Sequence, residues 1–455
     1  MTINAKQQTD VDLREMMLGL NTLVRLADGR KVPAINFDNA ATTPPFKQVA
    51  EEIQAKLLCY GSIGRGKGQK SAYSTRVYEN GRCVVKEFLC ANQPKYTVFY
   101  TNNTTDGMNK LASALLENRR DIVLTTRMEH HANDLPWRER TRTVYAEVDA
   151  KGRLLMGDIE RLLKAYKGRI KYVAVTAASN VTGYVNDVHK IAKIAHRHGA
   201  QIIVDGAQIV AHRPFSMLSP HKAGDDIDYF VFSAHKMYSP YGGGAVVGLR
   251  KSLNKHIPEF YGGGMVEQVT DDDVIFAAAP DCYEAGSPND PGVVGMLKAM
   301  KMLKQIGFNY VKDHEQRLLK KVLRDLKAIP GVLLYGDNEN IADRVGIIVF
   351  NLAGISDGEV AEKLAQCAGI AVRHAKFCAH PYVDRLLKQH ASCLSGGAHT
   401  GMVRVSFGIY NTEAEADCLI ETIKSLLRGK EPHFFCTGYK SSGLSGASKL
   451  PHDRG

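Results

Sequence analysis

The feature that most constrains this sequence is an alternation of short β-branched runs with helical patterns between Tyr96 and Val247. Such alternation is typical of a parallel or mixed sheet that helices cover on its faces. The expected strands are TVFY (97–100), DIVLTT (121–126), IKYVAVT (170–176), QIIVDGA (201–207), DYFVFSA (228–234) and GAVVG (244–248). The sequence therefore predicts an α/β fold whose chemistry lies at the carboxyl ends of strands.

A chain of 455 residues that is 44% hydrophobic can bury more than one core. We expect a large domain over residues 31–300 and a smaller C-terminal α+β domain over residues 301–430. We expect residues 1–30 to form an arm that packs on one of the two domains. Residues 431–455 are rich in Gly and Ser, which predicts a flexible tail.

The net charge of +11 could point to nucleic acid, but the basic residues form no run of five or more. A basic surface that suits an anionic cofactor and substrate is the preferred interpretation, and no nucleic-acid partner is expected. The first twenty residues carry interspersed charges and no continuous apolar stretch. They predict neither a signal peptide nor a membrane anchor, so we expect a cytoplasmic protein.

Lys236 stands in FSAHKMYSPYGGG, directly after an expected strand and before a run of glycines. An amine held at the end of a rigid element, beside groups that can bind phosphate, suits covalent attachment of pyridoxal 5′-phosphate (PLP). A lysine considered alone is most often a surface residue. The neighbouring motifs reverse that interpretation.

Asp205 and Gln208 belong to VDGAQ, roughly thirty residues before Lys236. A carboxylate at the end of this strand can pair with a protonated pyridine nitrogen. The competing interpretation is that Asp205 is the N-cap of the next helix, which is about equally consistent with the residue alone.

Asn103, Thr104 and Thr105 stand between an expected strand and a helix with an apolar face. Free backbone N–H groups and the helix dipole favour an anion such as phosphate at that position. The threonines could also simply cap the helix, and both roles are compatible.

The sequence resembles the class V family of PLP enzymes that holds cysteine desulfurases and selenocysteine lyases, especially its group II members. Motifs typical of this family follow one another in the right order over roughly residues 36–425. They are FDNAATTP (37–44), NNTTDG (102–107), MEHHAN (128–133), SNVTG (179–183), VDGAQ (204–208), FSAHKMYSP (232–240), YEAGSPN (283–289), RHAKFCAHP (373–381) and VRVSFGIYNT (403–412).

The resemblance implies the fold-type I architecture, with a mostly parallel, mixed seven-stranded sheet in the large domain. It implies that Lys236 carries PLP and that Asp205 pairs with the pyridine nitrogen. The other residues expected at the cofactor are Thr104, Thr105, Ser233 and His235 at the phosphate, Asn180 and Gln208 at the ring hydroxyl, and His130 stacked on the ring as a further catalytic group.

The resemblance also implies a homodimer, because Ser287 of YEAGSPN matches a hydroxyl residue that reaches the phosphate of the neighbouring subunit. Residues near the amino-acid substrate are expected to be Asn39, Ala40, Ala41, Thr42, Arg373 and Arg404. Arg404 matches the arginine that binds the substrate carboxylate, for which a bidentate guanidinium is well suited.

Cys378 aligns with the cysteine that holds sulfur as a persulfide in the desulfurases. The role needs a partly exposed thiol near positive charge, while a small buried structural cysteine is the competing interpretation. The pattern departs from group II at this point: Ala375 replaces a glycine, Lys376 and Phe377 replace two histidines, and residues 388–401 look like an insertion.

The family resemblance implies removal of sulfur or selenium from L-cysteine or selenocysteine to give alanine, with a sulfur-acceptor protein as an expected partner. The altered segment leaves open another class V reaction, namely a transaminase, an epimerase or a C–S lyase on a different thioether. A catalytically weak scaffold is a third hypothesis. No metal is expected, because Cys378, His380, Cys393 and His399 lack the paired spacing of a zinc site.

Overall fold

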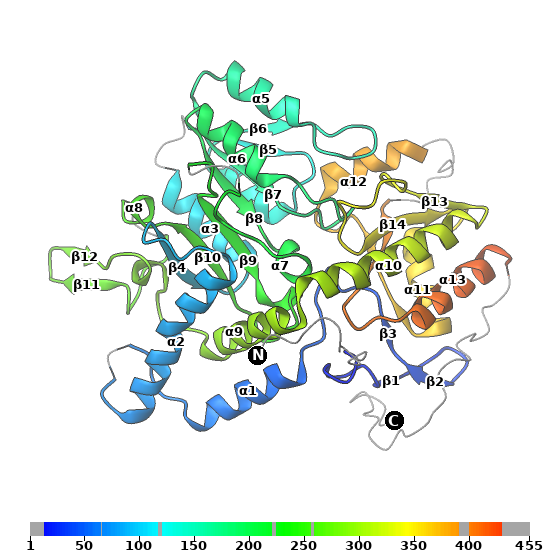
Figure 1. Cartoon of the computed structure of the whole chain (residues 1–455), viewed down its shortest axis with the longest axis horizontal. Coiled ribbons are helices and arrows are strands. Elements are labelled where there is room, and N and C mark those ends of the chain that lie inside the picture. The colour runs from blue at the N-terminus through cyan, green and yellow to red at the C-terminus, as the bar shows by residue number, and fades with distance from the viewer. Residues whose placement is uncertain are drawn as a thin grey trace.

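A computed structural model describes residues 13–64, 66–116, 121–220, 224–255, 259–390 and 400–429. Its main sheet has seven strands in the order β4–β10–β9–β8–β7–β5–β6 (Figure 1). Only β10 runs antiparallel to its neighbours. The strands are β4 (Tyr96–Thr101), β5 (Ile122–Thr126), β6 (Arg142–Ala146), β7 (Ile170–Thr176), β8 (Gln201–Asp205), β9 (Tyr229–Ser233) and β10 (Gly244–Leu249). The predicted α/β class and the mixed, mostly parallel seven-stranded sheet are confirmed.

The sequence identified every strand of this sheet except β6. Its five residues alternate in burial, with only Val144 and Ala146 buried, because β6 forms one edge of the sheet. A half-exposed edge strand of this length gives a weak apolar signal.

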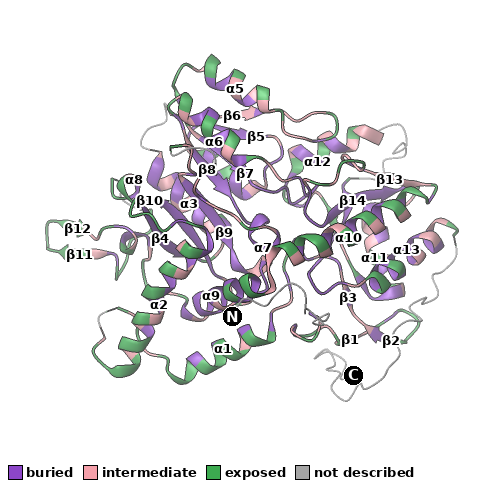
Figure 2. Ribbon diagram, in the orientation of Figure 1, coloured by how far each residue is buried: buried purple, intermediate pink, exposed green. Residues whose placement is uncertain are grey.

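The two faces of the sheet pack into separate hydrophobic clusters. Phe99, Val123 and Val231 point to the face covered by α3 (Thr104–Leu115), and their neighbours Val98, Leu124 and Phe230 point to the opposite face. Burial on both faces explains why the sequences of the central strands are continuous apolar runs. Figure 2 shows these strands buried beneath helices that are only partly buried. The helices of the second face include α2 (Gln69–Phe88), α5 (Met156–Ala165), α6 (Val188–Arg197) and α9 (Asp290–Ile306).

A second, smaller sheet has the strand order β13–β14–β17–β16 and forms its own core with α10, α11 and α13. Its elements are α10 (Phe308–Lys327), β13 (Val332–Leu334), β14 (Ile347–Leu352), α11 (Asp357–Ala368), β16 (Arg373–Ala375), β17 (Met402–Ser406) and α13 (Glu413–Leu427). The segment β3 (Ile35–Asn36) joins this body by pairing with β15 (Ile370–Ala371). The boundary near residue 300 stays a prediction.

The remaining elements connect or extend these two bodies. They are β1 (Leu23–Arg25), β2 (Lys31–Pro33), α1 (Lys47–Leu58), η1 (His131–Asn133), α4 (Leu135–Arg140), α7 (Ile209–His212), η2 (Ala234–Lys236), α8 (Arg250–Leu253), β11 (Val266–Val269), β12 (Val274–Phe276), η3 (Asp281–Tyr283), α12 (His380–Leu387) and η4 (Lys388–His390). The β11–β12 hairpin stands out from the large domain in Figure 1. None of the described helices has the length and apolarity needed to cross a bilayer.

Candidate active site

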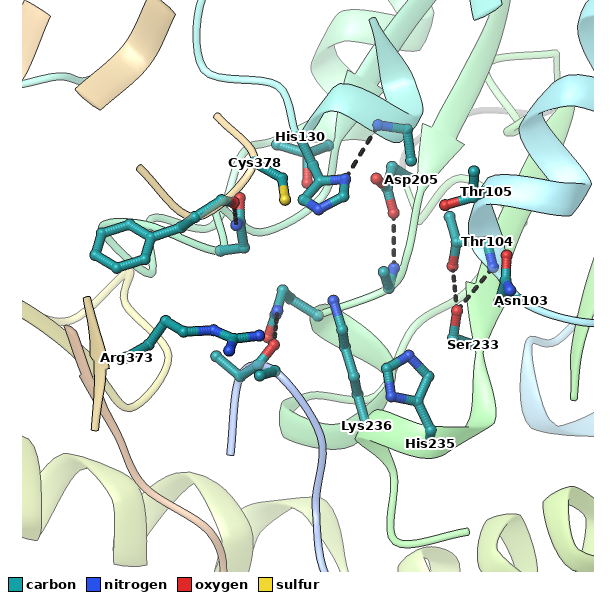
Figure 3. Close-up of a pocket in the computed structure, with 18 of the residues that line it drawn as sticks. Asn103, Thr104, Thr105, His130, Asp205, Ser233, His235, Lys236, Arg373 and Cys378 are labelled. Atoms are coloured by element: carbon teal, nitrogen blue, oxygen red, sulfur yellow. Dashed lines mark hydrogen bonds between the residues drawn. The ribbon is translucent and has the colours of Figure 1, made fainter. Parts of the chain in front are cut away.

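A cavity of about 630 Å³ lies where the loops after β4, β7, β8 and β9 meet residues 373–378 and Arg404 (Figure 3). Most of the residues singled out in the sequence line it: Ala40, Ala41, Thr104, Thr105, His130, Asn180, Asp205, Gln208, Ser233, His235, Lys236, Arg373, Cys378 and Arg404. Asn39, Thr42 and Ser287 do not line it. Segments separated by more than 350 positions in the chain therefore form one site, and the individual roles stay predictions.

Lys236 ends η2, the short turn that follows β9, and its side chain extends into the cavity. Burial lowers the pKa of its ammonium group to about 8, although the carboxylate of Asp205 acts in the opposite direction. An amine with this pKa has a minor but appreciable neutral fraction near physiological pH, far larger than that of an ordinary lysine. It can therefore act as a nucleophile or accept a proton.

Asp205 ends β8 and is 3% exposed. One carboxylate oxygen accepts a hydrogen bond from the Ala207 amide at 2.9 Å, and burial raises the pKa of the carboxyl group. The N-cap of α7 is Gln208, so the structure does not support the interpretation of Asp205 as a helix cap. Asp205 is instead a buried carboxyl group that lines the cavity.

Gln208 and Asn180 present amide groups to the same cavity. The Gln208 side chain donates to the Ala40 carbonyl at 2.9 Å, and that of Asn180 donates to the Phe377 carbonyl at 2.9 Å. The Gln208 Oε1 atom is buried and has no hydrogen-bond partner among the described residues. A buried orphan acceptor of this kind is expected where a ligand hydroxyl or N–H group binds.

The far end of the cavity is formed by the start of α3. Asn103 is the N-cap and accepts from the Asp106 amide at 2.9 Å, so the cap is Asn103 rather than either threonine. Ser233 accepts from the Thr104 amide at 2.7 Å, and the two hydroxyl groups are 2.7 Å apart. Hydroxyl groups gathered at a helix N-terminus suit a phosphate. Burial and the charge of Lys236 lower the pKa of His235 to about 4, so His235 is neutral there.

His130 reaches the cavity from the turn before η1. Its Nδ1 atom accepts a hydrogen bond from the Ala132 amide at 3.0 Å, which places the ring proton on Nε2. Burial, and then the charge of Lys236, lower the pKa of His130 to about 3. The imidazole is therefore neutral, with one defined tautomer.

Glu129 supports this site from behind the cavity wall, and the sequence analysis did not identify it. It is 3% exposed and accepts from the Thr126 hydroxyl at 2.5 Å and the Asn133 amide at 2.7 Å. Burial raises its pKa to about 8. These bonds fix the turn that carries His130. A charged residue directly beside His130, just beyond a buried strand, was the available signal.

Cys378 is exposed, with a free thiol, and its sulfur points into the cavity near His130 (Figure 3). Its carbonyl accepts from the His131 amide at 2.7 Å. The backbone around it is strained, because Ala375, Phe377 and Cys378 have φ angles of 81°, 49° and 53°. Such conformations cost about 1–3 kcal/mol each in non-glycine residues and persist only where neighbouring contacts impose them.

Arg404 is 2% exposed and lies on β17, opposite Arg373 of β16. It donates to the Asn180 carbonyl at 2.9 Å and forms an ion pair with Asp38 at 3.0 Å. The ring centroid of Phe377 lies 5.0 Å from its guanidinium carbon. Asp38 was not singled out in the sequence, although it belongs to the FDNAATTP motif. Arg404 Nε is buried without a hydrogen-bond partner in the described part of the chain, so it is a free donor.

Three predicted residues lie elsewhere. Asn39 bonds to the Ser406 carbonyl and to Asn411, and the Thr42 hydroxyl donates to the His235 carbonyl. Both residues support the loop that carries Ala40 and Ala41 rather than face the cavity. Ser287 lines a separate cavity of about 130 Å³.

The described residues contain no group of three His, Cys, Asp or Glu side chains placed to hold a metal ion. Cys393 and His399, which entered the zinc alternative, lie outside the described residues.

Comparison with known proteins shows the family to which this chain belongs. The family model described as "Aminotransferase class-V" matches residues 35–419. The chain belongs to the class-V aminotransferase family. The matched region includes both sheets and every residue that lines the cavity.

Similar members of the family include proteins named as cysteine desulfurases. The chain is 34% identical over 87% of its length to a probable cysteine desulfurase of Mycobacterium leprae, and 33% identical to a cysteine desulfurase of Haloferax volcanii. It spans 62% of the length of the first relative and 90% of the second. The solved cysteine desulfurase of Thermococcus onnurineus superimposes with a TM-score of 0.78 at 29% identity, over 87% of this chain and 95% of that one.

Proposed function

We propose that this protein is a PLP-dependent cysteine desulfurase, which removes sulfur from L-cysteine, or selenium from selenocysteine, and releases alanine. The observation that carries the proposal is the shared cavity of Lys236, Asp205, Arg404 and Cys378. The first two suit a PLP ring, Arg404 suits an amino-acid carboxylate, and Cys378 supplies a thiol. The similarity to proteins named as cysteine desulfurases gives independent support.

The residues present fit PLP. The cavity offers an amine, a buried carboxylate, an orphan acceptor on Gln208 and a hydroxyl-rich helix N-terminus for the phosphate. When bound, PLP supplies an electron sink that stabilises negative charge at the substrate Cα. Asp205 would keep the ring nitrogen protonated, and His130 would cover one face of the ring.

The remaining steps belong to side chains of this protein. The Arg404 guanidinium would bind the substrate carboxylate and fix the orientation of Cα. The amine of Lys236, with a pKa of about 8, would take the proton from Cα and return it. Neutral His130 would present its Nε2–H group to the reacting atoms.

Cys378 would accept the sulfur. Its thiolate would attack the Sγ atom of the bound cysteine, so that a new S–S bond forms and the substrate Cβ–Sγ bond breaks. The electron pair of that bond would stay with the substrate carbon skeleton, which takes up a proton and becomes alanine. L-cysteine and a protein thiol thus give alanine and a protein persulfide, with no external oxidant or reductant. The exposed position of Cys378 would allow a thiol, on an acceptor protein, to receive the sulfur next.

We also propose that two copies form a homodimer. Ser287 stands outside its own chain's cavity, as a residue of the neighbouring subunit's site would. Large apolar side chains of the hairpin region are exposed and would be covered by a partner: Phe260, Tyr261, Val269, Val274 and Ile275.

Alanine release from L-cysteine by the PLP-loaded protein tests the function, with Cys378→Ala measured beside it. We expect alanine from the wild type and loss of at least about 100-fold of the rate in the variant. Keto-acid exchange without alanine from cysteine or selenocysteine would instead favour a transaminase and overturn the proposal.

A further inference from the structure

Asp357, the first residue of α11, contacts the Cys378 segment although it does not line the cavity. Its side chain is 5% exposed. One carboxylate oxygen accepts from the Ala375 amide at 3.1 Å, and the other accepts from the Gly401 amide at 3.3 Å. The carboxylate therefore connects the end of β16 to the residue just before β17.

This connection closes one end of a strand pair that bears directly on the site. In the β16–β17 ladder, Arg373 lies opposite Arg404 and Ala375 lies opposite Met402. The ladder carries Arg404 on one strand and leads into Cys378 on the other. A shift at Ala375 would therefore move Cys378 relative to Arg404.

The backbone at this end is strained. Ala375 has a φ of 81°, and a Cβ atom on Gly401 would lie 2.4 Å from the Ala375 Cα atom. The two backbones are in close contact, and a non-glycine residue adopts a left-handed conformation there. A carboxylate that binds both amides offsets this strain.

His374 contributes a further contact, since its Nδ1 atom lies 3.4 Å from the same carboxylate. On the other side of the segment, Asn180 holds the Phe377 carbonyl and His131 holds the Cys378 carbonyl. The large domain thus holds the segment at Phe377 and Cys378, and α11 holds it at Ala375.

We infer that Asp357 is a positioning residue for Cys378, and that it sets where the thiol stands by holding Ala375 and Gly401 together. The inference rests on the sulfur-accepting role proposed for Cys378. The strained peptide at Ala375 is held in place by the Asp357 carboxylate, and loss of that carboxylate frees residues 373–378 without disturbing the cofactor residues.

The test compares Asp357→Ala with Glu359→Ala in the PLP-loaded protein. Glu359 is a matched control, because it lies in the same first turn of α11 but is exposed and pairs with Lys363. Amide hydrogen exchange of the peptide that spans residues 372–380 is expected to rise by about tenfold or more in Asp357→Ala and to stay unchanged in the control. Exchange around Lys236 and the visible absorption of bound PLP are expected to match the wild type.

Alanine release is the second measurement. We expect kcat of Asp357→Ala to fall by about 10- to 100-fold, because the thiol is misplaced, with KM for L-cysteine changed by less than about twofold. Adding Ala375→Gly to Asp357→Ala should recover part of the loss, because glycine adopts the same backbone conformation without strain. A purely structural role would give no such rescue.

Unchanged hydrogen exchange of residues 372–380 in Asp357→Ala would overturn the inference, and so would loss of PLP binding. The exchange measurement needs no desulfurase activity. If the wild type releases no alanine from L-cysteine, the proposed function fails while the role of Asp357 in holding the segment is still decided.

Discussion

Asp38 forms an ion pair at 3.0 Å with Arg404, which lines the cavity, so the arginine expected to bind substrate has a carboxylate partner within the chain. Asp38 is itself about one-fifth exposed, whereas Arg404 is almost fully buried. Burial lowers the pKa of the Arg404 guanidinium, and Asp38 counters that effect. Asp38 thereby keeps a buried cation stable before any substrate carboxylate arrives.

Asp38→Ala should lower the free energy of unfolding by about 1–3 kcal/mol, because it leaves the buried charge of Arg404 without its counterion. Chemical denaturation measures this effect. Arg373→Ala is the control, since Arg373 faces the same carboxylate at 3.7 Å and is 54% exposed. Loss of the Arg373 side chain should lower the free energy of unfolding by no more than about 0.5 kcal/mol. Equal effects of the two substitutions would contradict this account of Asp38.

The depressed pKa of Lys236 predicts how cofactor loading depends on pH. Only the neutral amine reacts with the aldehyde of PLP, so loading of the PLP-free protein should accelerate as pH rises through about 8 and then level off. Asp205→Asn removes a charge that raises this pKa, and should move the midpoint to lower pH. Stopped-flow absorbance would measure both profiles. A midpoint near 10.5, the ordinary value for lysine, would contradict the prediction.

The raised pKa of Glu129 predicts that part of the free energy of unfolding depends on pH. Its pKa is about 8 in the folded protein, against an ordinary value of 4.5, so the folded state binds more protons than the unfolded state between these values. This contribution is full below about pH 4.5 and is lost as pH rises toward 8. In Glu129→Gln the free energy of unfolding should fall less steeply over that window, by up to about 1.4 kcal/mol per pH unit. If the free energy of unfolding changed with pH in the same way in the wild type and in Glu129→Gln, the raised pKa of Glu129 would be refuted.

The proposed homodimer makes a prediction about activity in mixed dimers. Lys236→Ala inactivates a subunit's own site, while Ser287→Asp should place a carboxylate against the phosphate in the partner's site. A heterodimer of the two variants would contain one site with native Lys236 and native Ser287. Statistical mixing after dissociation should then restore about a quarter of wild-type activity. Two inactive proteins that stay inactive on mixing would argue that Ser287 serves its own chain.

Much of this fold could be predicted because local chemistry and tertiary structure agree. The runs around Val173 and Val204 are buried within the sheet, and β-branched residues suit such buried strand positions. The positions of Lys236 and Asp205 at strand ends follow from the same pattern. The order of the family motifs predicts roles for these residues that their spacing alone does not indicate.

What the sequence did not predict depends on contacts between distant segments. In the sequence, nothing distinguishes Asp38 from the other charged residues. Its role depends on the contact with Arg404, which lies 366 positions later in the chain. Asp357 acquires its role only because β16 and β17 end beside the first turn of α11. The short strands β15 and β16 are separated by a single residue but pair with different partners, β3 and β17. Pairing partners of short strands are set by tertiary packing rather than by residue preference.

The most direct test of the central claim is the mass of the Cys378 peptide after a single turnover with L-cysteine, under conditions that exclude reductant. The account predicts an increase of about 32 Da, one sulfur atom, on Cys378 and an equal amount of released alanine. Alanine release with an unmodified Cys378, or added sulfur on a different cysteine, would contradict it.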